Sequence, residues 1–301
     1  MRYLLLNKLF KLNLVPQFFV ILFIFCFQTW CYGTEVNSRL WKIDKNGKEP
    51  SYILATMHSE DPRILILPDN YNKIFIGAKS FTAEIDLSID NTEILTKAMM
   101  LPANKKLKKI IGENLFKKSV IILNDYGIPE NIINQMKPWA VLMTLSYPKP
   151  KTGLFLDKLL FDKAIKMKKK YYGLETVQEQ IAIFDNASYA EQRILLLDSI
   201  KQYPSFEKQL EIIKQLYIKG DLDGLREYNK KVMLKGNYQV AEKFMIELLD
   251  KRNIKMVYRM KPRLGEGGAF IAVGALHLPG NAGILQLLRE QEYQLTPIKL
   301  Q

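Results

Sequence analysis

Strand-like segments lie near both ends of the chain and enclose a long stretch in which apolar residues recur at helical intervals. The segments with a strand pattern are residues 40–44, 51–55, 81–87, 269–273 and 293–298. Between them, residues 91–264 have helical periodicity, broken by proline and glycine and by one short strand-like run at residues 170–173. This order predicts one α/β domain, with a mixed central sheet and a large helical insertion between the N-terminal and C-terminal strands.

The first 33 residues have the pattern of a secretory signal peptide. Arg2, Lys8 and Lys11 precede an apolar run at residues 18–27, and a cleavage site is expected after Gly33. We therefore expect the mature domain to span residues 34–301 and to be periplasmic or secreted from a bacterium. The alternative is that this segment is not cleaved and anchors the protein in the membrane. The apolar run is short for this role, because a membrane-spanning helix needs about 20 apolar residues.

Composition excludes several classes of function. Both cysteines, Cys26 and Cys31, fall inside the expected signal, so the mature protein has no disulfide and no thiolate chemistry. Without the signal, the chain has 41 basic and 31 acidic residues, which gives a net charge of +10. The lysines alternate with apolar residues at helical spacing, for example in residues 105–118 and 158–170, and lack an aromatic stacking platform. We interpret them as solvated helix faces and expect no nucleic-acid partner.

The chain has two histidines, and they stand in matching contexts. His58 follows the apolar strand at 51–55, and His277 follows the one at 269–273. In each case a small residue, Ala55 or Gly274, lies three positions before the histidine, where it permits a tight turn or close approach to a ligand. The carboxyl ends of strands in an α/β sheet form binding crevices, so the repeated placement favours a functional site over two structural histidines.

Two carboxylates, Glu84 and Asp86, lie in a third apolar strand and are expected on the same face of it. Burying such charges without compensation would cost several kcal/mol for each ion. They could face water or a basic helix, or one could bind a cation or act as a general base. Two histidines and a carboxylate form a recurrent divalent-metal constellation, in which bound water becomes a nucleophile near neutral pH. Asp86 is the reserve carboxylate.

Several segments together resemble the TraB/GumN family, which is related to the Tiki metalloproteases, over nearly the whole chain after residue 33. They occur in the family's order and spacing: residues 51–58, 81–86, 137–139, 156–159, 173–176 with Glu179 and Gln180, 252–253, 272–280 and 283–297. The resemblance implies two Gly-x-x-His motifs and a glutamate that bind a divalent metal, with manganese or cobalt favoured and zinc as the alternative. Those positions are His58, His277 and Glu84 here.

The resemblance also implies hydrolysis of a peptide or another small-molecule substrate, in which Glu84 acts as third ligand or base. Glu175 and Arg252 match the family pattern too, with Gln180 and Asn253. These four residues could belong to the active site, or they could lie on a helix surface or cap a helix, and the two interpretations are equally good. Glu175 could orient a histidine as an outer partner, and Arg252 could stabilise an oxyanion or a substrate carboxylate. Ala55 departs from the family, which has glycine there, and alanine would be unfavourable if the turn required positive φ.

Two other functions compete with the metal-dependent hydrolase. The same fold could bind a peptide signal or haem without turnover, with Tyr52 near His58 as a haem-ligating pair. Alternatively, a histidine could act as a general base without metal, as in erythromycin-esterase-like relatives.

Overall fold

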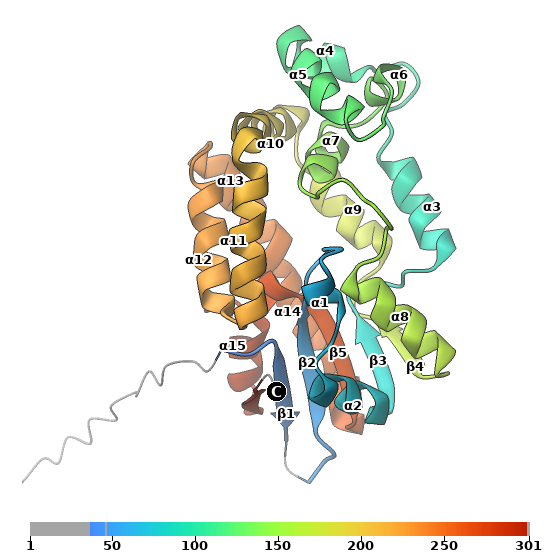
Figure 1. The fold of residues 1–301 in the computed structure, drawn as a ribbon, viewed down its shortest axis with the longest axis vertical. Coiled ribbons are helices and arrows are strands. Elements are labelled where there is room, and N and C mark those ends of the chain that lie inside the picture. Colours follow the sequence, from blue (N-terminus) through green and yellow to red (C-terminus); the bar gives the residue numbers. More distant parts are fainter. Residues whose placement is uncertain (1–36, 46, 300–301) are drawn as a thin grey trace, which may run out of the picture. The chain divides into compact units, whose positions relative to one another are not determined.

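The computed structural model describes residues 37–45 and 47–299. Within them the strands form one six-stranded sheet in the order β4-β3-β5-β2-β1-β6 (Figure 1). The neighbouring pairs β4/β3, β3/β5 and β5/β2 are parallel, whereas β1 is antiparallel to β2 and β6. The carboxyl ends of the four parallel strands therefore lie together at one end of the sheet, which we call the carboxyl edge. The strand bounds are β1 Leu40–Asp44, β2 Ser51–Thr56, β3 Ser80–Ala83, β4 Lys170–Gly173, β5 Ala269–Gly274 and β6 Gln294–Ile298.

The mixed α/β architecture expected from the sequence is confirmed, but strand β3 is shorter than the predicted residues 81–87 and ends at Ala83. The reason is local competition for backbone hydrogen bonds. The Asp86 carboxylate accepts from the backbone N–H of Ser88 at 2.9 Å, and the Asp86 carbonyl accepts from the Asn91 amide at 2.9 Å. The chain therefore leaves the sheet after Glu84, whose carbonyl still accepts the backbone N–H of Glu175 at 2.7 Å. The expectation that Glu84 and Asp86 share one strand face is wrong.

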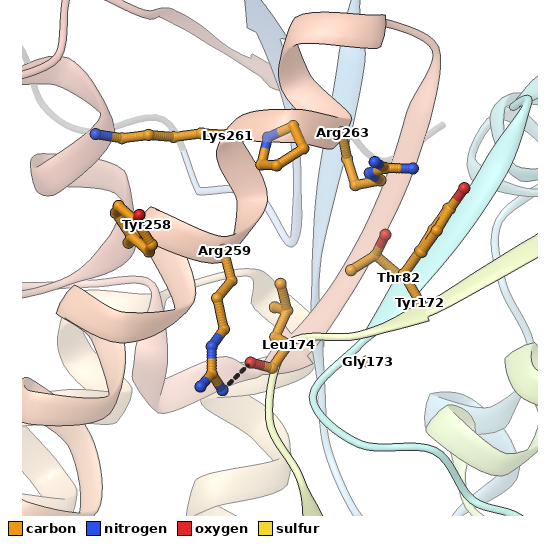
Figure 2. A pocket seen from close by; sticks show the side chains of 9 residues that line it. Thr82, Tyr172, Gly173, Leu174, Tyr258, Arg259, Lys261 and Arg263 are labelled. Carbon is orange, nitrogen blue, oxygen red and sulfur yellow. Dashed lines mark hydrogen bonds between the residues drawn. The ribbon is translucent and has the colours of Figure 1, made fainter.

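Helices cover both faces of the sheet. On one face, α2 (Asp69–Gly77) and α8 (Leu156–Lys166) pack their apolar side chains on Phe81 and Phe270. On the other face lie α14 (Lys251–Glu266) and α15 (Ile284–Arg289). Beside α14, next to the edge strand β4 and its neighbour β3, lies a cavity of about 460 Å³ (Figure 2).

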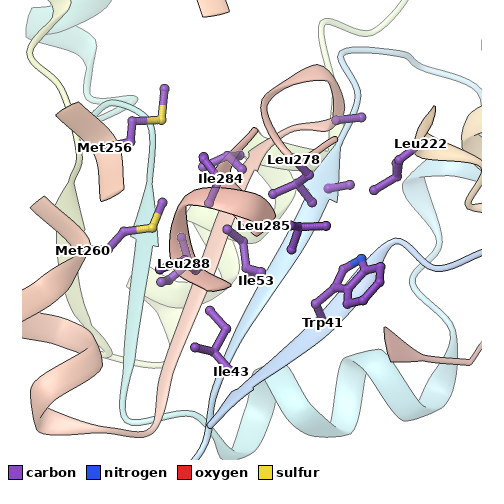
Figure 3. Packing of buried hydrophobic residues seen from close by; sticks show 14 of the residues in the cluster. Trp41, Ile43, Ile53, Leu222, Met256, Met260, Leu278, Ile284, Leu285 and Leu288 are labelled. Carbon is purple, nitrogen blue, oxygen red and sulfur yellow. The ribbon is translucent and has the colours of Figure 1, made fainter. Parts of the chain in front are cut away.

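The core under α14 fixes this helix on the sheet. Met256 and Met260 of α14 pack with Ile284 and Leu288 of α15 over the strands, and all four are fully buried (Figure 3). Ile271 of the central strand β5 belongs to the same cluster and is 0 % exposed. Because α14 also carries Arg252 and Asn253, this packing sets the position of both side chains relative to the strand ends.

The predicted helical insertion occupies the chain between β3 and β5, interrupted by β4, and most of its helices lie beyond one end of the sheet (Figure 1). It has an apolar core of its own, which includes Phe116 and Trp139. The bounds are α3 Ile89–Ala98, α4 Leu107–Ile111, α5 Glu113–Asn124, α6 Glu130–Ile133, α7 Pro138–Leu145, α9 Val177–Asp185, α10 Tyr189–Gln202, α11 Phe206–Lys219, α12 Leu222–Met233 and α13 Tyr238–Met245. A short helix α1, Pro62–Leu65, precedes α2, and a π-helical turn, Ile246–Asp250, joins α13 to α14.

The expected signal segment, residues 1–33, lies outside the described residues. Among the residues that are described, none of the helices combines the length and the apolar character needed to cross a bilayer.

We expect the contact between α14 and β5 to carry much of the stability. Ile271→Ala should lower the free energy of unfolding by about 2–5 kcal/mol, because a cavity remains where the side chain was packed. Ile254→Ala on the exposed side of α14, where the side chain is 61 % exposed, is the matched control and should change it by about 0.5 kcal/mol or less. Urea denaturation measures both. Equal losses would contradict this view of the core.

Candidate active site

Each of the four parallel strands is followed closely by a residue that could carry chemistry. Glu84 comes directly after β3, His58 and Glu175 come two residues after β2 and β4, and His277 comes three residues after β5. Since these strands are neighbours in the sheet and run in the same direction, four residues distant in sequence are brought to one edge. This edge is where open α/β sheets bind ligands.

His277 is buried and held in one tautomer. Its Nδ1 lies 2.6 Å from Oδ1 of Asn253, and the Asn253 amide nitrogen donates to the carbonyl of Ala282 at 2.8 Å. The Asn253 oxygen must therefore accept from the ring, so Nδ1 carries the proton and Nε2 keeps a lone pair. Burial lowers the pKa of His277 to about 4, so the ring is neutral at pH 7. The free Nε2 faces Oε1 of Glu84 at 3.7 Å.

Glu84 is an ionised carboxylate with both oxygens engaged. Oε1 accepts the backbone N–H of Gly274 at 2.7 Å, and Oε2 accepts from Nη2 of Arg252 at 2.6 Å and from the Gln180 amide at 3.2 Å. Burial by itself would raise the pKa of Glu84. In the low pH range where Glu84 titrates, the His277 ring is protonated, and its charge, the charge of Arg252 and the hydrogen bond from Gly274 outweigh burial and bring this pKa to about 2.

The two small residues that precede the histidines have different roles. A Cβ at Gly274 would lie 3.2 Å from Oε1 of Glu84 and 3.5 Å from Cδ2 of His277, so a side chain there would crowd the site. Ala55 lies inside strand β2, and it is not among the residues with positive φ. Its carbonyl accepts the buried hydroxyl of Tyr217 at 2.9 Å. Alanine in the first motif therefore causes no backbone strain.

Arg252 joins two carboxylates. Its Nε lies 3.0 Å from both oxygens of Glu175, and its Nη2 reaches Glu175 at 2.7 Å and Glu84 at 2.6 Å. Nη1 donates to the carbonyl of Leu248 in the π-helical turn Ile246–Asp250, at 3.1 Å. In this arrangement Arg252 supports Glu84, whereas the sequence had suggested an oxyanion or substrate contact. The residue that orients a histidine is Asn253, and Glu175 contacts Arg252 instead.

His58 belongs to a second pair at the same edge. Its Nε2 lies 3.4 Å from Oδ2 of Asp157, whose Oδ1 accepts the hydroxyl of Thr56 at 2.7 Å. Oδ2 is buried and has no hydrogen-bond partner among the described residues, and burial raises the pKa of this carboxyl. The His58 side chain is 48 % exposed and packs against the rings of Phe155 and Tyr147, at 4.4 Å and 5.7 Å.

The three predicted metal ligands thus lie at the carboxyl edge. His277 and Glu84 form a close pair, and His58 is their neighbour. His277 and Glu84 face each other, and His58 contributes to lowering the pKa of Glu84 while it contacts Asp157. Within residues 37–45 and 47–299, no group of three or more His, Cys, Asp or Glu side chains is close enough to enclose a metal. Asp86, the reserve carboxylate, instead accepts a hydrogen bond from Ser88.

The donors of the close pair fit a divalent cation. An imidazole lone pair and a carboxylate oxygen separated by 3.7 Å can both contact one ion, because metal–nitrogen and metal–oxygen bonds are about 2.0–2.2 Å long. Charge supports the same conclusion. Glu84 and Glu175 contribute two negative charges, and among the described residues Arg252 is the cation that forms ion pairs with them. A bound cation would compensate the remaining charge.

Sequence reasoning gave no role to Asp157, Tyr147 or Phe155. Asp157 lies in the first turn of α8, where an acidic residue is ordinary because of the helix dipole. Tyr147 is 38 % exposed; partial desolvation of its phenol and the nearby Glu84 and Asp157 raise its pKa above the ordinary value, so the phenol remains a donor at neutral pH. Only the family resemblance at 156–159 could have drawn attention to Asp157, and nothing in the sequence indicates Tyr147.

The proposed haem pair is not assembled. Tyr52 lies near the amino end of β2, paired with Phe270, whereas His58 follows the opposite end of that strand. Tyr52 and Thr56 are four residue steps apart along the strand, a distance of about 13 Å.

The fold and site define a class: a mixed α/β protein with a neutral histidine facing an ionised glutamate at the carboxyl edge of the sheet. Residues 39–297 match the TraB/PrgY/gumN family, and the chain belongs to this family.

Among known proteins, the chain is 24 % identical to Metalloprotease TIKI1 of Homo sapiens and 25 % identical to Metalloprotease TIKI2 of Xenopus tropicalis, over 87 % of this chain in each case. It covers 62 % and 60 % of their lengths, so it spans about six tenths of these relatives. It is also 24 % identical to the uncharacterized protein YbaP of Shigella flexneri, over 81 % of this chain and 89 % of that protein. No solved structure matches the chain.

The tautomer and charge of His277 can be tested directly by nuclear magnetic resonance, since the chain has only two imidazoles. In metal-free protein labelled with ¹⁵N-histidine, we expect one ring to remain neutral, with its proton on Nδ1, until the pH falls to about 4. His277→Ala assigns the signal. A ring at position 277 that titrates near its ordinary pKa of 6.5, or that carries its proton on Nε2, would contradict the geometry.

Proposed function

We propose that this protein is an exported, metal-dependent hydrolase that cleaves peptide bonds, with His277, Glu84 and His58 as ligands of a divalent cation. The observation that carries the proposal is the pair formed by the neutral His277 and the ionised Glu84, whose Nε2 and Oε1 face each other at 3.7 Å. Export rests on the signal-like pattern of residues 1–33. Peptide substrates are suggested by the relatives that are called metalloproteases.

Side chains and backbone groups of this chain orient the two proposed ligands His277 and Glu84. Asn253 keeps the lone pair of His277 Nε2 available, and Arg252 with Gly274 holds the Glu84 carboxylate in place. A divalent cation in such a site activates water at neutral pH and polarises a carbonyl oxygen. His58, which is half exposed, would complete the ligand set by turning from Asp157.

Proton transfer and charge stabilisation would also come from side chains at this edge. Asp157 has a raised pKa and one oxygen without a hydrogen-bond partner among the described residues, so it can accept or return a proton near the substrate. The protonated phenol of Tyr147 is a donor for a developing oxyanion. Manganese, cobalt and zinc are all compatible with a nitrogen and oxygen donor set.

The decisive experiment measures metal affinity and turnover together. After removal of metal, the full chain is titrated with Mn²⁺, Co²⁺ and Zn²⁺ by calorimetry and assayed on quenched fluorescent peptides. Glu84→Gln and His277→Ala should each weaken binding by more than about 100-fold, because loss of an outer partner alone already costs about 10–100-fold. Turnover should fall with affinity.

Glu49→Gln is the matched control, since Glu49 is a partly exposed carboxylate paired with Lys79, away from the carboxyl edge. It should leave metal affinity unchanged. If wild type binds the ions no better than the His58→Ala/His277→Ala double variant, the proposal is wrong. Turnover that survives a chelator would instead indicate a histidine acting as a base without metal.

A further inference from the structure

A second candidate binding site lies on the α14 face of the sheet, apart from the cluster around Glu84. It is the cavity of about 460 Å³ between α14 and the strands β3 and β4, of which β4 is the edge strand (Figure 2). This volume is within the range of small-molecule pockets, roughly 300–1,000 Å³. Arg259, which lines the cavity, is seven residues beyond Arg252 on α14, and two helical turns correspond to about 10 Å. Arg259 pairs with Glu179 and with the carbonyl of Leu174, so its charge is used within the protein.

Thr82 is the first sign of a ligand. It lines the cavity, it is 0 % exposed in the free chain, and its hydroxyl has no hydrogen-bond partner among the described residues. Figure 2 shows this hydroxyl on the side of the cavity where Arg263 lies. A buried hydroxyl without a partner is unfavourable, and valine has the same shape without this penalty. The fold alone therefore gives no reason for threonine at this position.

Arg263 is the second sign. Its guanidinium lies 4.0 Å from the centre of the Tyr172 ring, and the side chain is 19 % exposed. Its ion pair is with Glu266, which is 56 % exposed, so the pair is open to water. Stacking on an aromatic ring holds the guanidinium plane, and an oxyanion could bind its edge in place of the exposed Glu266 carboxylate. Tyr172 and Thr82 are partners in the β3/β4 register, which places the hydroxyl and the guanidinium on the same face.

The rest of the lining fits an anion with an apolar body. The lining contains Arg259, Lys261 and Arg263 and no carboxylate, and Lys261 forms no ion pair with the described residues. Tyr258, Leu174 and Pro262 provide apolar surface. We propose that this cavity binds a small organic oxyanion, a carboxylate or a phosphate on an apolar or aromatic body, through Arg263 and Thr82. The site is independent of the proposed metal chemistry.

The test uses benzoate, phenyl phosphate and benzyl alcohol as probes, titrated into the full chain by calorimetry. One or both anions should bind, and the neutral alcohol should not. Binding of benzoate alone identifies a carboxylate site, and binding of phenyl phosphate alone identifies a phosphate site. Thr82→Val should weaken binding by about tenfold or more, as expected for loss of a hydrogen bond to a charged group, while thermal stability stays equal or rises. Arg263→Gln should weaken binding at least as much.

Three control variants establish whether the probes bind in this cavity. Arg63→Gln removes an exposed guanidinium from α1 and should not change probe affinity. Thr96→Val removes an exposed hydroxyl from α3 and should also have no effect. His277→Ala should leave probe affinity unchanged, because the cavity does not include the metal site. The proposal is wrong if neither anion binds wild type, if the alcohol binds as well as the anions, or if Thr82→Val lowers the melting temperature.

Discussion

The contact on which the site depends is the bridge from Arg252 to the carboxylates of Glu84 and Glu175. Each partner comes from a different part of the chain: Glu84 follows β3, Glu175 follows β4, and Arg252 lies in the first turn of α14. The bridge therefore ties the end of the helical insertion to the edge of the sheet. Removing Arg252 would leave both carboxylates without the cation that they share, which costs about 3–5 kcal/mol.

The same helix turn organises the second half of the site. Asn253, adjacent to Arg252, is fully buried and sets the tautomer of His277. One segment thus fixes a carboxylate after β3 and an imidazole after β5, two strands that are hydrogen-bonded neighbours. The π-helical turn Ile246–Asp250 just before this segment supplies the carbonyl that holds Nη1 of Arg252, and such turns are frequent at functional sites. The long insertion therefore ends in the residues that position the candidate catalytic edge.

Much of this arrangement could be predicted from the sequence, and the limits have physical reasons. Apolar pattern located the strands that place His58 and His277 at neighbouring ends, because buried strands have a strong local signal. The end of β3 was missed, since the Asp86 turn competes with strand pairing through side-chain contacts that periodicity does not encode. The contact of His58 with Asp157 was also missed, because it joins residues far apart in the sequence. The pairing of His277 with Asn253, and not with Glu175, depends on packing of α14 that no local pattern reveals.

We propose that His277 and His58 both bind one cation with Glu84. Pulsed electron paramagnetic resonance of Mn²⁺ bound to protein with ¹⁵N-labelled histidine tests it most directly, because the chain has two imidazoles and no others to confuse the spectrum. We expect couplings from two directly bonded imidazole nitrogens, reduced to one in His58→Ala or in His277→Ala. A spectrum of tightly bound Mn²⁺ without a directly bonded nitrogen would contradict it.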